Sequence, residues 1–289
     1  MKLLIVGAKG MLAHDVCRVA TRAGHELILV DLPELDITEQ DAVVALLQRE
    51  RPEATINCAA WTDVDGAESN VEGARAVNAQ GAGNLGRAAA LVGTPLLHVS
   101  TDYVFDGKPP LDDAGRPRPY LESDPTGPRS VYGETKLAGE RQVLEASSQH
   151  IVVRTAWLYG VNGRNFVETM LRLAGERDAV QVVDDQVGSP TWSGHLAPAL
   201  VGLLERGVSG VVHQTGAGSV SWNGFAKEIF RQAEIDCRVQ EITSEQMARP
   251  APRPAWSAME SERPEVIPMP DWRDGLAGYL AARAGMVSA

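Results

Sequence analysis

The sequence contains few cysteines, a deficit of basic residues and no long hydrophobic run. Its three cysteines, Cys17, Cys58 and Cys237, are widely spaced and have no histidine at a metal-ligand spacing. This pattern argues against a disulfide framework or a zinc site and predicts reduced, buried thiols. Nowhere do about 18 apolar residues run together, and the first apolar run is too short for a signal peptide. We therefore expect a cytoplasmic protein without a membrane segment.

Acidic residues outnumber basic residues by 38 to 27, which gives a formal net charge of −11. Such a balance argues against nucleic acid or an anionic membrane as the main partner. Any anionic ligand must therefore be held by a local site. The 289 residues suffice for one large α/β domain or for a domain and a half.

A predicted strand, a glycine turn and a predicted helix open the chain. Residues 3–6 form a short apolar run that ends at Gly7, and Gly10 precedes a helical pattern. Glycines at such a turn let backbone amides approach a pyrophosphate, and the helix N-terminus adds partial positive charge. The Gly-x-x-Gly-x-x-Ala spacing differs from the dinucleotide fingerprint, and glycines also end strands for purely steric reasons.

A second strand is predicted over residues 25–30 and ends at Asp31. An acidic residue at this place meets the adenosine ribose hydroxyls in dinucleotide-binding folds. It would repel a 2′-phosphate and so favour NADH, but a plain turn or helix cap is an equal alternative. Residues 36–38 are predicted to begin the next helix, with Thr38 and Asp41 forming an acidic variant of the capping box.

Strands and helices continue to alternate along the chain. Residues 55–60 and 95–100 are predicted strands, with helical patterns between about 64 and 93. This alternation predicts a parallel sheet with right-handed crossovers, an α/β fold that binds its ligand at the carboxyl ends of the strands. Thr101 and Asp102 lie at such an end. The loop that follows, rich in Gly, Pro, Asp and Arg, leads to Tyr132.

Tyr132 and Lys136 lie four residues apart in a helix predicted over 130–148, and so share one face. A free tyrosine has a pKa of about 10, and a neighbouring positive charge such as Lys136 would lower it. Reduction of a ketone needs a proton donor on the oxygen and a hydride from a cofactor. The pair is also common on solvated helix faces, so its weight comes from the nucleotide-binding pattern in the same chain.

Shorter segments after about residue 161 predict a smaller lobe folded against the sheet. Helices are predicted over 165–173, 194–206, 221–234 and 272–284, and strands over 179–183, 210–214 and 238–242.

Three motifs together resemble the extended short-chain dehydrogenases/reductases, and within them the dTDP-4-dehydrorhamnose reductases. The motifs are Gly7-x-x-Gly10, Ser100-Thr101-Asp102-Tyr103-Val104-Phe105-Asp106-Gly107 and Tyr132-Gly133-x-x-Lys136. The likeness continues through residues 154–160, 185–191 and 253–257, and covers nearly the whole chain.

The resemblance implies a Rossmann-like doubly wound parallel sheet with a smaller C-terminal substrate-binding lobe. Residues 1–160 would form the NAD(P)-binding domain, and residues 161–289 the sugar-nucleotide-binding lobe. The implied reaction uses NADPH or NADH to reduce the 4-keto group of dTDP-4-dehydro-L-rhamnose to dTDP-L-rhamnose. Tyr132 would donate the proton, Thr101 would hydrogen-bond the sugar carbonyl, and Lys136 would bind the nicotinamide ribose and lower the Tyr132 pKa.

The resemblance also implies two binding sets. The cofactor-binding residues would be Gly7, Gly10, Met11, Leu12, Asp31, Asp36, Ile37, Ala60, Trp61, Thr62, Tyr132 and Lys136. The substrate-binding residues would be Thr101, Asp102, Tyr132 and Trp157. We add Arg253 as a diphosphate contact, because a guanidinium binds two oxygens at once; a surface arginine in a Pro-rich loop is the alternative.

The sequence departs from the family pattern at Ala13, where a glycine is usual, and at Trp61, where a smaller or imidazole side chain is common. Some members pair as homodimers through acidic residues and magnesium. Asp15 is a candidate for one such ligand, but no full set is present and we predict no metal.

Three alternatives remain open at this stage. One is a reductase of another dTDP-4-keto-6-deoxysugar, and another is an epimerase or dehydratase of the same superfamily. The third is a non-catalytic regulatory subunit resembling that of methionine adenosyltransferase. The Thr101, Tyr132 and Lys136 set argues against the regulatory alternative, since a binding module needs no tuned proton donor.

Overall fold

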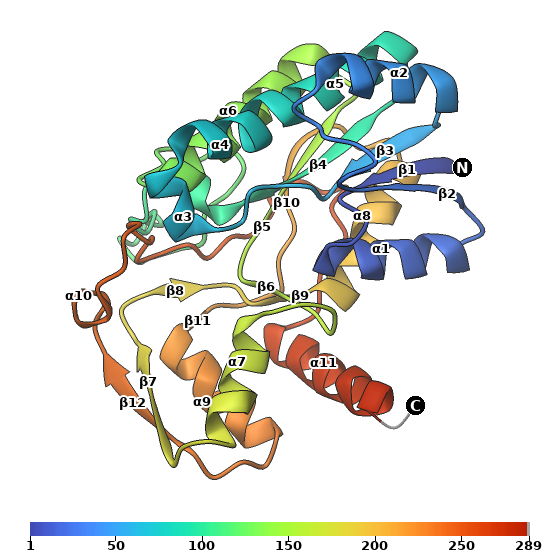
Figure 1. Cartoon of the computed structure of the whole chain (residues 1–289). Helices are drawn as coiled ribbons and strands as arrows, with labels where there is room; N and C mark the ends of the chain where they lie inside the picture. The colour runs from blue at the N-terminus through green and yellow to red at the C-terminus, as the bar shows by residue number, and fades with distance from the viewer. Residues whose placement is uncertain (288–289) are drawn as a thin grey trace.

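A six-stranded parallel sheet forms the centre of the computed structural model, which describes residues 1–287 (Figure 1). The strand order is β10-β5-β4-β3-β1-β2. The strands are β1 (Lys2–Val6), β2 (Glu26–Val30), β3 (Ala54–Asn57), β4 (Leu96–Thr101), β5 (Ile151–Thr155) and β10 (Gly210–His213). The parallel strands bring all their carboxyl ends to one edge, as the alternating pattern predicts.

The strand order reverses between β1 and β3, because the chain first adds β2 on one side and then builds outward on the other. In open α/β sheets, ligands bind in the crevice at such a switch point. The glycine turn after β1 and residues 58–60 after β3 both border this crevice.

Helices cover both faces of the sheet, and the expected doubly wound α/β fold is confirmed (Figure 1). On one face, α1 (Met11–Arg22) and α8 (Ser193–Glu205) pack together over β1 and β3. The other face is covered by α2 (Gln40–Glu50), α5 (Ala82–Val92) and α6 (Val131–Ala146), and the short α3 (Val64–Ser69), α4 (Val71–Arg75) and η1 (Ala76–Gly81) precede α5. The strands between these layers are buried on both sides.

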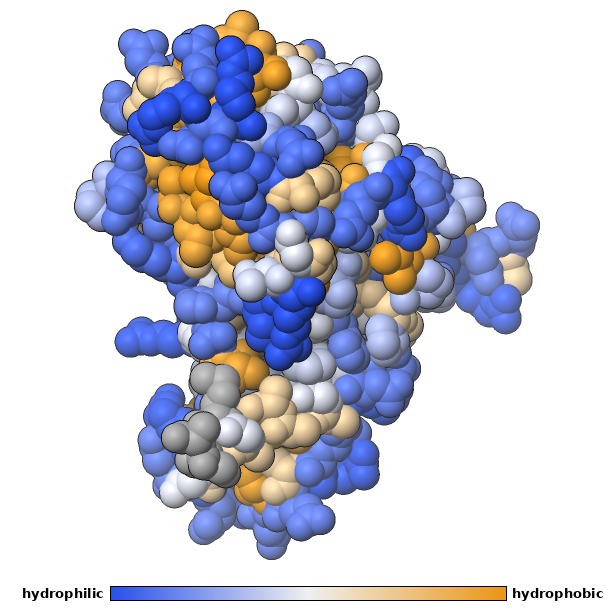
Figure 2. All heavy atoms as spheres, turned by 90° about the vertical axis from the view of Figure 1, so that its right-hand side faces the viewer, coloured by the Kyte–Doolittle hydropathy of each residue, from blue (hydrophilic) through white to orange (hydrophobic). Residues whose placement is uncertain are grey.

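A smaller lobe lies below the sheet in Figure 1. It contains α7 (Phe166–Ala174), α9 (Trp222–Gln232), α10 (Ser244–Met247) and α11 (Trp272–Val287). Its strands pair as β7 (Ala179–Val183) with β12 (Arg238–Ile242), β8 (Val187–Gly188) with β11 (Val220–Ser221), and β6 (Leu158–Tyr159) with β9 (Thr191–Trp192). A separate aromatic-rich core, including Tyr159, Phe225 and Tyr279, holds it together. Figure 2 shows the larger body and this lobe joined by a narrower waist.

The capping box predicted at Thr38 is wrong. The helix α2 begins at Gln40, after an N-cap residue, Glu39, whose side chain makes no capping hydrogen bond. The Asp36 carboxylate instead accepts hydrogen bonds from the backbone N–H and the hydroxyl of Thr38. A short acidic side chain that bonds its own following backbone favours a turn over a helix, which delays the helix start.

The three thiols are free, as predicted, but only Cys237 is buried, whereas Cys17 and Cys58 are half-buried. None of the helices within residues 1–287 combines the length and the apolar character needed to cross a membrane.

Candidate active site

The turn between β1 and α1 is a cradle that only glycine can form. Gly7 has a φ of 76°, and a Cβ added there would lie 2.6 Å from the Ala59 backbone nitrogen. The Gly10 N–H donates to the Gly7 carbonyl at 3.0 Å and closes the turn. Gly10 is the N-cap of α1 and has no side chain to satisfy the first-turn N–H groups of Met11 and Leu12. This open helix end and close backbone approach fit a pyrophosphate.

Asp31 lies directly after β2 and faces this cradle. Its carboxylate accepts hydrogen bonds from the backbone N–H groups of Lys9 and Leu32, both at 2.8 Å. The side chain therefore ties the end of β2 to the glycine turn. These bonds are those expected if Asp31 is a structural turn cap, the alternative to a ribose contact. Ile37 is buried against Gly81 on the same side of the sheet.

The segment after β3 is held against α6 by Asn78, a residue to which sequence analysis gave no role. The Trp61 N–H donates to Asn78 Oδ1 at 2.8 Å, and the Asn78 amide donates to the Trp61 carbonyl and to Thr135 Oγ1, each at 3.2 Å. This clamp fixes the backbone of Ala60, Trp61 and Thr62 at the crevice. Ala60 and Trp61 are half-buried and Thr62 is exposed.

Thr101, Asp102 and Tyr132 meet at the carboxyl end of β4. Thr101 caps the one-turn helix η2 (Asp102–Val104) by accepting a hydrogen bond from the Tyr103 N–H, and its hydroxyl donates to Asp102 Oδ1 at 3.0 Å. Tyr132 reaches Thr101 from the first turn of α6, which is capped by the Ser130 hydroxyl. The sequence-predicted trio is therefore brought together.

Asp102 is an unusual carboxyl because it is almost fully buried and its Oδ2 has no hydrogen-bond partner within the described residues. Burial raises its pKa to about 6, against the lowering effect of Ser257 and Thr101. A carboxyl with such a pKa exchanges its proton near neutral pH.

The predicted lowering of the Tyr132 pKa by Lys136 is not found. Burial raises the pKa of Tyr132 to about 12, and Asp102 adds to the rise, while the contact with Thr101 opposes it. The Lys136 amine instead donates to the Val99 carbonyl at 2.8 Å, and burial, Thr101 and Asp102, rather than the Lys136 charge, shift the pKa of Tyr132. Burial also lowers the pKa of Lys136 to about 8, so Lys136 loses its positive charge at a lower pH than a free lysine does.

A buried ion pair supports the helix that carries Tyr132 and Lys136. Arg154 on β5 donates to both carboxylate oxygens of Glu140 on α6, at 2.8 to 3.2 Å, and the Ser100 hydroxyl donates to the same carboxylate at 2.5 Å. These contacts join α6 to β4 and β5. Sequence analysis did not detect this pair.

Trp157 follows β5 at the boundary with the smaller lobe. It has a φ of 46°, which is uncommon for a bulky residue. Its ring stacks on Trp222 of α9, with ring centroids 3.5 Å apart and an interplanar angle of 5°. The stack ties the end of the sheet to the smaller lobe.

Arg253 is already engaged by protein groups. Its two terminal nitrogens each lie 2.9 Å from an Asp65 carboxylate oxygen, and one also donates to the Ala251 carbonyl. A diphosphate would have to compete with Asp65 for this guanidinium. Asp15, the candidate magnesium ligand, is likewise engaged, because it accepts hydrogen bonds from Ser193 and Arg18.

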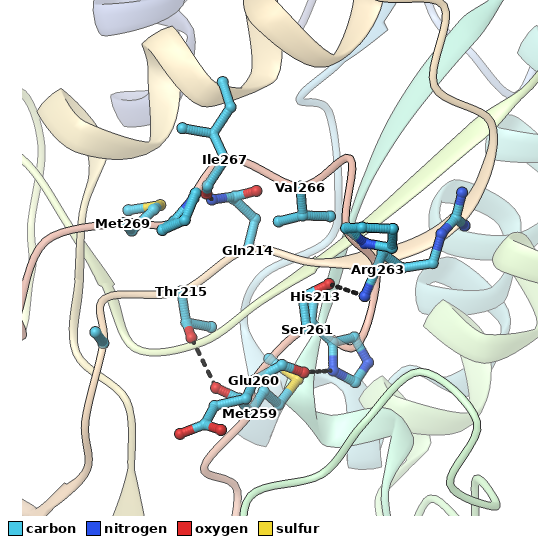
Figure 3. A pocket seen from close by; sticks show the side chains of 13 residues that line it. His213, Gln214, Thr215, Met259, Glu260, Ser261, Arg263, Val266, Ile267 and Met269 are labelled. Atoms are coloured by element: carbon cyan, nitrogen blue, oxygen red, sulfur yellow. Dashed lines mark hydrogen bonds between the residues drawn. The ribbon is translucent and has the colours of Figure 1, made fainter.

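A cavity of about 370 Å³ lies two strands away from Thr101, at the end of β10 (Figure 3). Its polar side chains hold the surrounding segment 259–269 in place. The Gln214 amide donates to the Ile267 carbonyl at 2.6 Å and the Thr215 hydroxyl donates to the Met259 carbonyl at 3.0 Å. None of the predicted site residues lines this cavity.

The glycine cradle at the sheet switch point and the Tyr132 to Lys136 spacing beside Thr101 define a short-chain dehydrogenase/reductase. Comparison with known proteins narrows this class. The chain belongs to the family described as the RmlD substrate binding domain, whose family model matches residues 1–284.

Similar proteins span almost the same length. The dTDP-4-dehydrorhamnose reductase of Mycobacterium tuberculosis (strain H37Rv) is 45% identical, over 99% of this chain and 95% of the relative. A probable dTDP-4,6-dihydroxy-2-methyloxan-3-one 4-ketoreductase of Streptomyces antibioticus is 42% identical, over 96% and 93%. The crystal structure of dTDP-4-dehydrorhamnose reductase from Bacillus anthracis in complex with NADP is 37% identical, covers 97% and 99%, and superposes with a TM-score of 0.92.

Proposed function

We infer that this chain uses NAD(P)H to reduce the 4-keto group of dTDP-4-dehydro-L-rhamnose, giving dTDP-L-rhamnose. The observation that carries this inference is the contact between the Tyr132 phenol and Thr101 at the carboxyl ends of the strands, one helical turn from Lys136. Relatives of the same length that bear the reductase name support it.

The proposed roles follow from where each side chain lies. When bound, the reduced nicotinamide supplies the hydride. Gly7, Gly10 and the N-terminus of α1 bind the pyrophosphate through backbone N–H groups, which need no positive side chain. Tyr132 donates the proton to the carbonyl oxygen, and Thr101 orients that oxygen. Thr101 is buried and Tyr132 is half-buried, which limits the access of water to the reacting centre.

The smaller lobe is proposed to bind the nucleotide end of the substrate, with residues 1–160 as the cofactor-binding part. The Trp157 and Trp222 stack at the boundary offers a flat face for a base or a sugar ring. Arg253 is proposed to exchange Asp65 for the diphosphate, since phosphate and carboxylate bind its planar guanidinium in the same bidentate way.

A second copy of the chain is proposed as a partner, which light scattering would test.

A second candidate is reduction of a different dTDP-4-keto-6-deoxysugar. The Streptomyces antibioticus relative, named as a 4-ketoreductase of such a compound, is almost as similar as the relative from Mycobacterium tuberculosis. A pocket separates such related sugars by a few polar contacts. The set of Thr101, Tyr132 and Lys136 at the carboxyl end of the sheet argues against a purely regulatory protein.

The test is to follow oxidation of NADPH and of NADH by absorbance, with dTDP-4-dehydro-L-rhamnose generated in place from dTDP-glucose by the upstream enzymes. Consumption with dTDP-L-rhamnose as the product supports the proposal. Consumption only with another dTDP-4-keto-6-deoxysugar supports the second candidate. Cofactor binding without consumption of either coenzyme by any such sugar would overturn both.

A further inference from the structure

Three hydroxyl and carboxyl side chains meet beneath the end of β4, and two of their oxygens lack hydrogen-bond partners. Thr101 Oγ1 accepts the Tyr103 N–H at 3.2 Å and lies 3.0 Å from Asp102 Oδ1. The other carboxyl oxygen, Asp102 Oδ2, and the Ser257 hydroxyl oxygen make no hydrogen bond of standard geometry within residues 1–287. Asp102 is 2% exposed and Ser257 is 1% exposed, so bulk water does not reach either side chain.

Ser257 faces the Asp102 carboxyl from the segment that follows Arg253. Its hydroxyl lowers the pKa of Asp102, which is the effect of a donor directed at a carboxylate. The Ser257 backbone is held by its N–H, which donates to the Val187 carbonyl at 2.8 Å. A rotation of the Ser257 side chain about χ1 would pair its hydroxyl with Asp102 Oδ2 while the backbone stays in place. Each of the two unpaired oxygens is therefore the available partner of the other.

An ionised Asp102 takes up the only proton of the Thr101 hydroxyl. A hydroxyl has one proton and two lone pairs, and one lone pair of Thr101 accepts the Tyr103 N–H. A carboxylate has no proton to donate, so the 3.0 Å contact with Asp102 uses the Thr101 proton. This bond outcompetes one to a ketone, because a carboxylate is the stronger acceptor. Thr101 then presents only a lone pair to any ligand.

Protonation of Asp102 at Oδ1 reverses this bond. The acid O–H then donates to Thr101 Oγ1, and the Thr101 proton is released for a third group. The Ser257 hydroxyl donates to the remaining carboxyl oxygen. A proton on Oδ2 would instead leave the Ser257 proton without an acceptor in a buried site, which costs free energy. The arrangement in which every donor has an acceptor runs from Ser257 through Asp102 to Thr101.

We propose that Asp102 is a positioning residue whose proton turns the Thr101 hydroxyl into a donor for the substrate carbonyl, with Ser257 holding the second carboxyl oxygen. This role rests on the proposed reduction, in which Thr101 contacts the keto oxygen. Asp102 keeps its own proton in that reaction, since the proton that is transferred comes from Tyr132. Ionisation of Asp102 therefore removes the assistance of Thr101 without removing the proton donor.

The groups around Asp102 let it change protonation near pH 6. Burial raises its pKa to about 6, although two hydroxyls and the backbone N–H groups of Asp102 and Tyr103 favour the carboxylate. Two phenols face it, Tyr103 on η2 and Tyr132 on α6, and burial raises the pKa of both, so they stay neutral in this range. Arg253 from the neighbouring segment acts on Tyr103.

Infrared spectroscopy of the whole protein tests the protonation without substrate, so its outcome is separate from that of the reduction assay. The C=O stretch of a protonated carboxyl is distinct from that of a carboxylate, and its loss in Asp102→Asn assigns it. We expect Asp102 to ionise near pH 6. An Asp102 that is already ionised at pH 5 would overturn its proposed role.

Ser257→Ala tests the second carboxyl oxygen by the same infrared measurement. The change removes a donor that favours the carboxylate, so the Asp102 titration should move upward by roughly one pH unit. Because this readout needs neither turnover nor a change at Asp102, it also serves if Asp102→Asn fails to fold. An unmoved titration would overturn the role of Ser257.

Asp102→Asn imitates the protonated acid, because its NH₂ group can donate to Thr101 while its oxygen accepts from Ser257. In the unaltered protein, kcat should fall by roughly a hundredfold from about pH 5.5 to about pH 8, the scale of one lost donor to a developing oxyanion. Asp102→Asn should lack the loss near pH 6, whereas Asp102→Ala, which cannot donate, should have the low rate throughout. Any change near pH 8 that belongs to Lys136 should persist in both variants.

Two results of this assay would overturn the proposal. One is an Asp102→Asn variant that binds NADPH but keeps the loss near pH 6, and the other is one that binds NADPH but turns over as slowly as Asp102→Ala. Absence of turnover by the unaltered protein with every dTDP-4-keto-6-deoxysugar would instead be a failure of the proposed reduction, and the infrared titration would still report on Asp102.

Thr101→Val separates an effect through Thr101 from a direct one. In this background no hydroxyl remains to be turned, so adding Asp102→Asn should not change the pH profile further. A remaining effect would mean that Asp102 acts on the substrate itself, which contradicts a positioning role.

Asp106→Asn is the matched control from the same loop. Its carboxylate accepts from the Tyr120 hydroxyl at 2.8 Å and from the Lys108 N–H at 3.0 Å, and neither bond involves Thr101. This variant should keep the loss of kcat near pH 6. If the loss disappeared here as well, any carboxylate of the loop would have the effect and the special role of Asp102 would be wrong.

Discussion

Tyr132 and Thr101 contact each other across the end of the sheet, although they come from different elements, the first turn of α6 and the last residue of β4. The contact places a proton donor and a hydrogen-bonding hydroxyl on one side of the same small space. Asp102 continues this line of groups, because it accepts the Thr101 hydroxyl proton in a hydrogen bond.

Tyr132→Phe tests the proton donor. We expect kcat to fall by about a hundredfold or more, the usual scale of a lost general acid, while NADPH binding stays nearly unchanged because the ring remains. Tyr103→Phe is the control, since its ring packs edge-on against Tyr132 at a centroid distance of 5.4 Å and should turn over close to normally. Near-normal turnover by Tyr132→Phe would remove its phenol from the mechanism.

Asp31→Asn tests the coenzyme preference. Removing the carboxylate charge beside the glycine turn should relieve repulsion of a 2′-phosphate, raising the kcat/KM ratio of NADPH to NADH by roughly tenfold, equivalent to about 1.4 kcal/mol. The amide oxygen can still accept one of the two backbone N–H groups, so the turn should persist. Glu34→Gln removes a charge from the same loop without contacting the Lys9 N–H, and should leave the ratio unchanged. An unchanged ratio for both variants would leave Asp31 as a structural cap.

Asp102→Asn tests the buried carboxyl through the pH dependence of stability. The folded-state pKa is raised to about 6 from 3.8, so between about pH 4 and pH 6 the folded protein keeps a proton that the unfolded chain releases. This group's contribution to the free energy of unfolding therefore falls as pH rises through that window, by at most about 3 kcal/mol.

Urea denaturation at pH 4 and pH 7 measures this contribution. The free energy of unfolding of Asp102→Asn, taken relative to that of the unaltered protein, should be higher at pH 7 than at pH 4, because the amide does not titrate. The exposed Asp113→Asn should show no such difference. Parallel pH curves for Asp102→Asn and the unaltered protein would contradict the raised pKa.

Arg154→Met tests the buried ion pair. Removing the guanidinium leaves the Glu140 carboxylate buried without its partner, which should lower the free energy of unfolding by roughly 3 to 5 kcal/mol. Arg231→Met breaks the ion pair with Glu228, in which the Arg231 side chain is 69% exposed. This change should lower the free energy of unfolding by less than about 1 kcal/mol. Equal losses in the two variants would mean that burial of the Glu140 pair has no energetic weight.

Much of the fold and part of the site follow from local sequence signals. The apolar strands, the glycine turn and the spacing of Tyr132 and Lys136 are each contained within a few residues, and the structure has them where they are predicted. Thr101 was predictable because the end of a parallel strand is a known place for ligand contacts.

The remaining contacts depend on pairing between distant residues. His98 meets Asn57 across 41 positions and Lys136 across 38, and nothing in the local pattern around a buried histidine reveals such partners. The pKa of Tyr132 was mispredicted for a related reason. Spacing places Lys136 on the same helix face, but only the folded structure shows that burial dominates and that the amine bonds to Val99.

The position of β10 and α8 has a consequence for biosynthesis on the ribosome. β10 completes the sheet beside β5, and α8 covers β1 and α1, yet both elements come after α7 and β7 of the smaller lobe in the chain. A nascent chain that has emerged only as far as Tyr159 would leave the β5 edge unpaired and the apolar face of α1 uncovered. The nucleotide-binding half can therefore reach its final form only after translation has passed His213, and pausing before that point would expose a surface for chaperones.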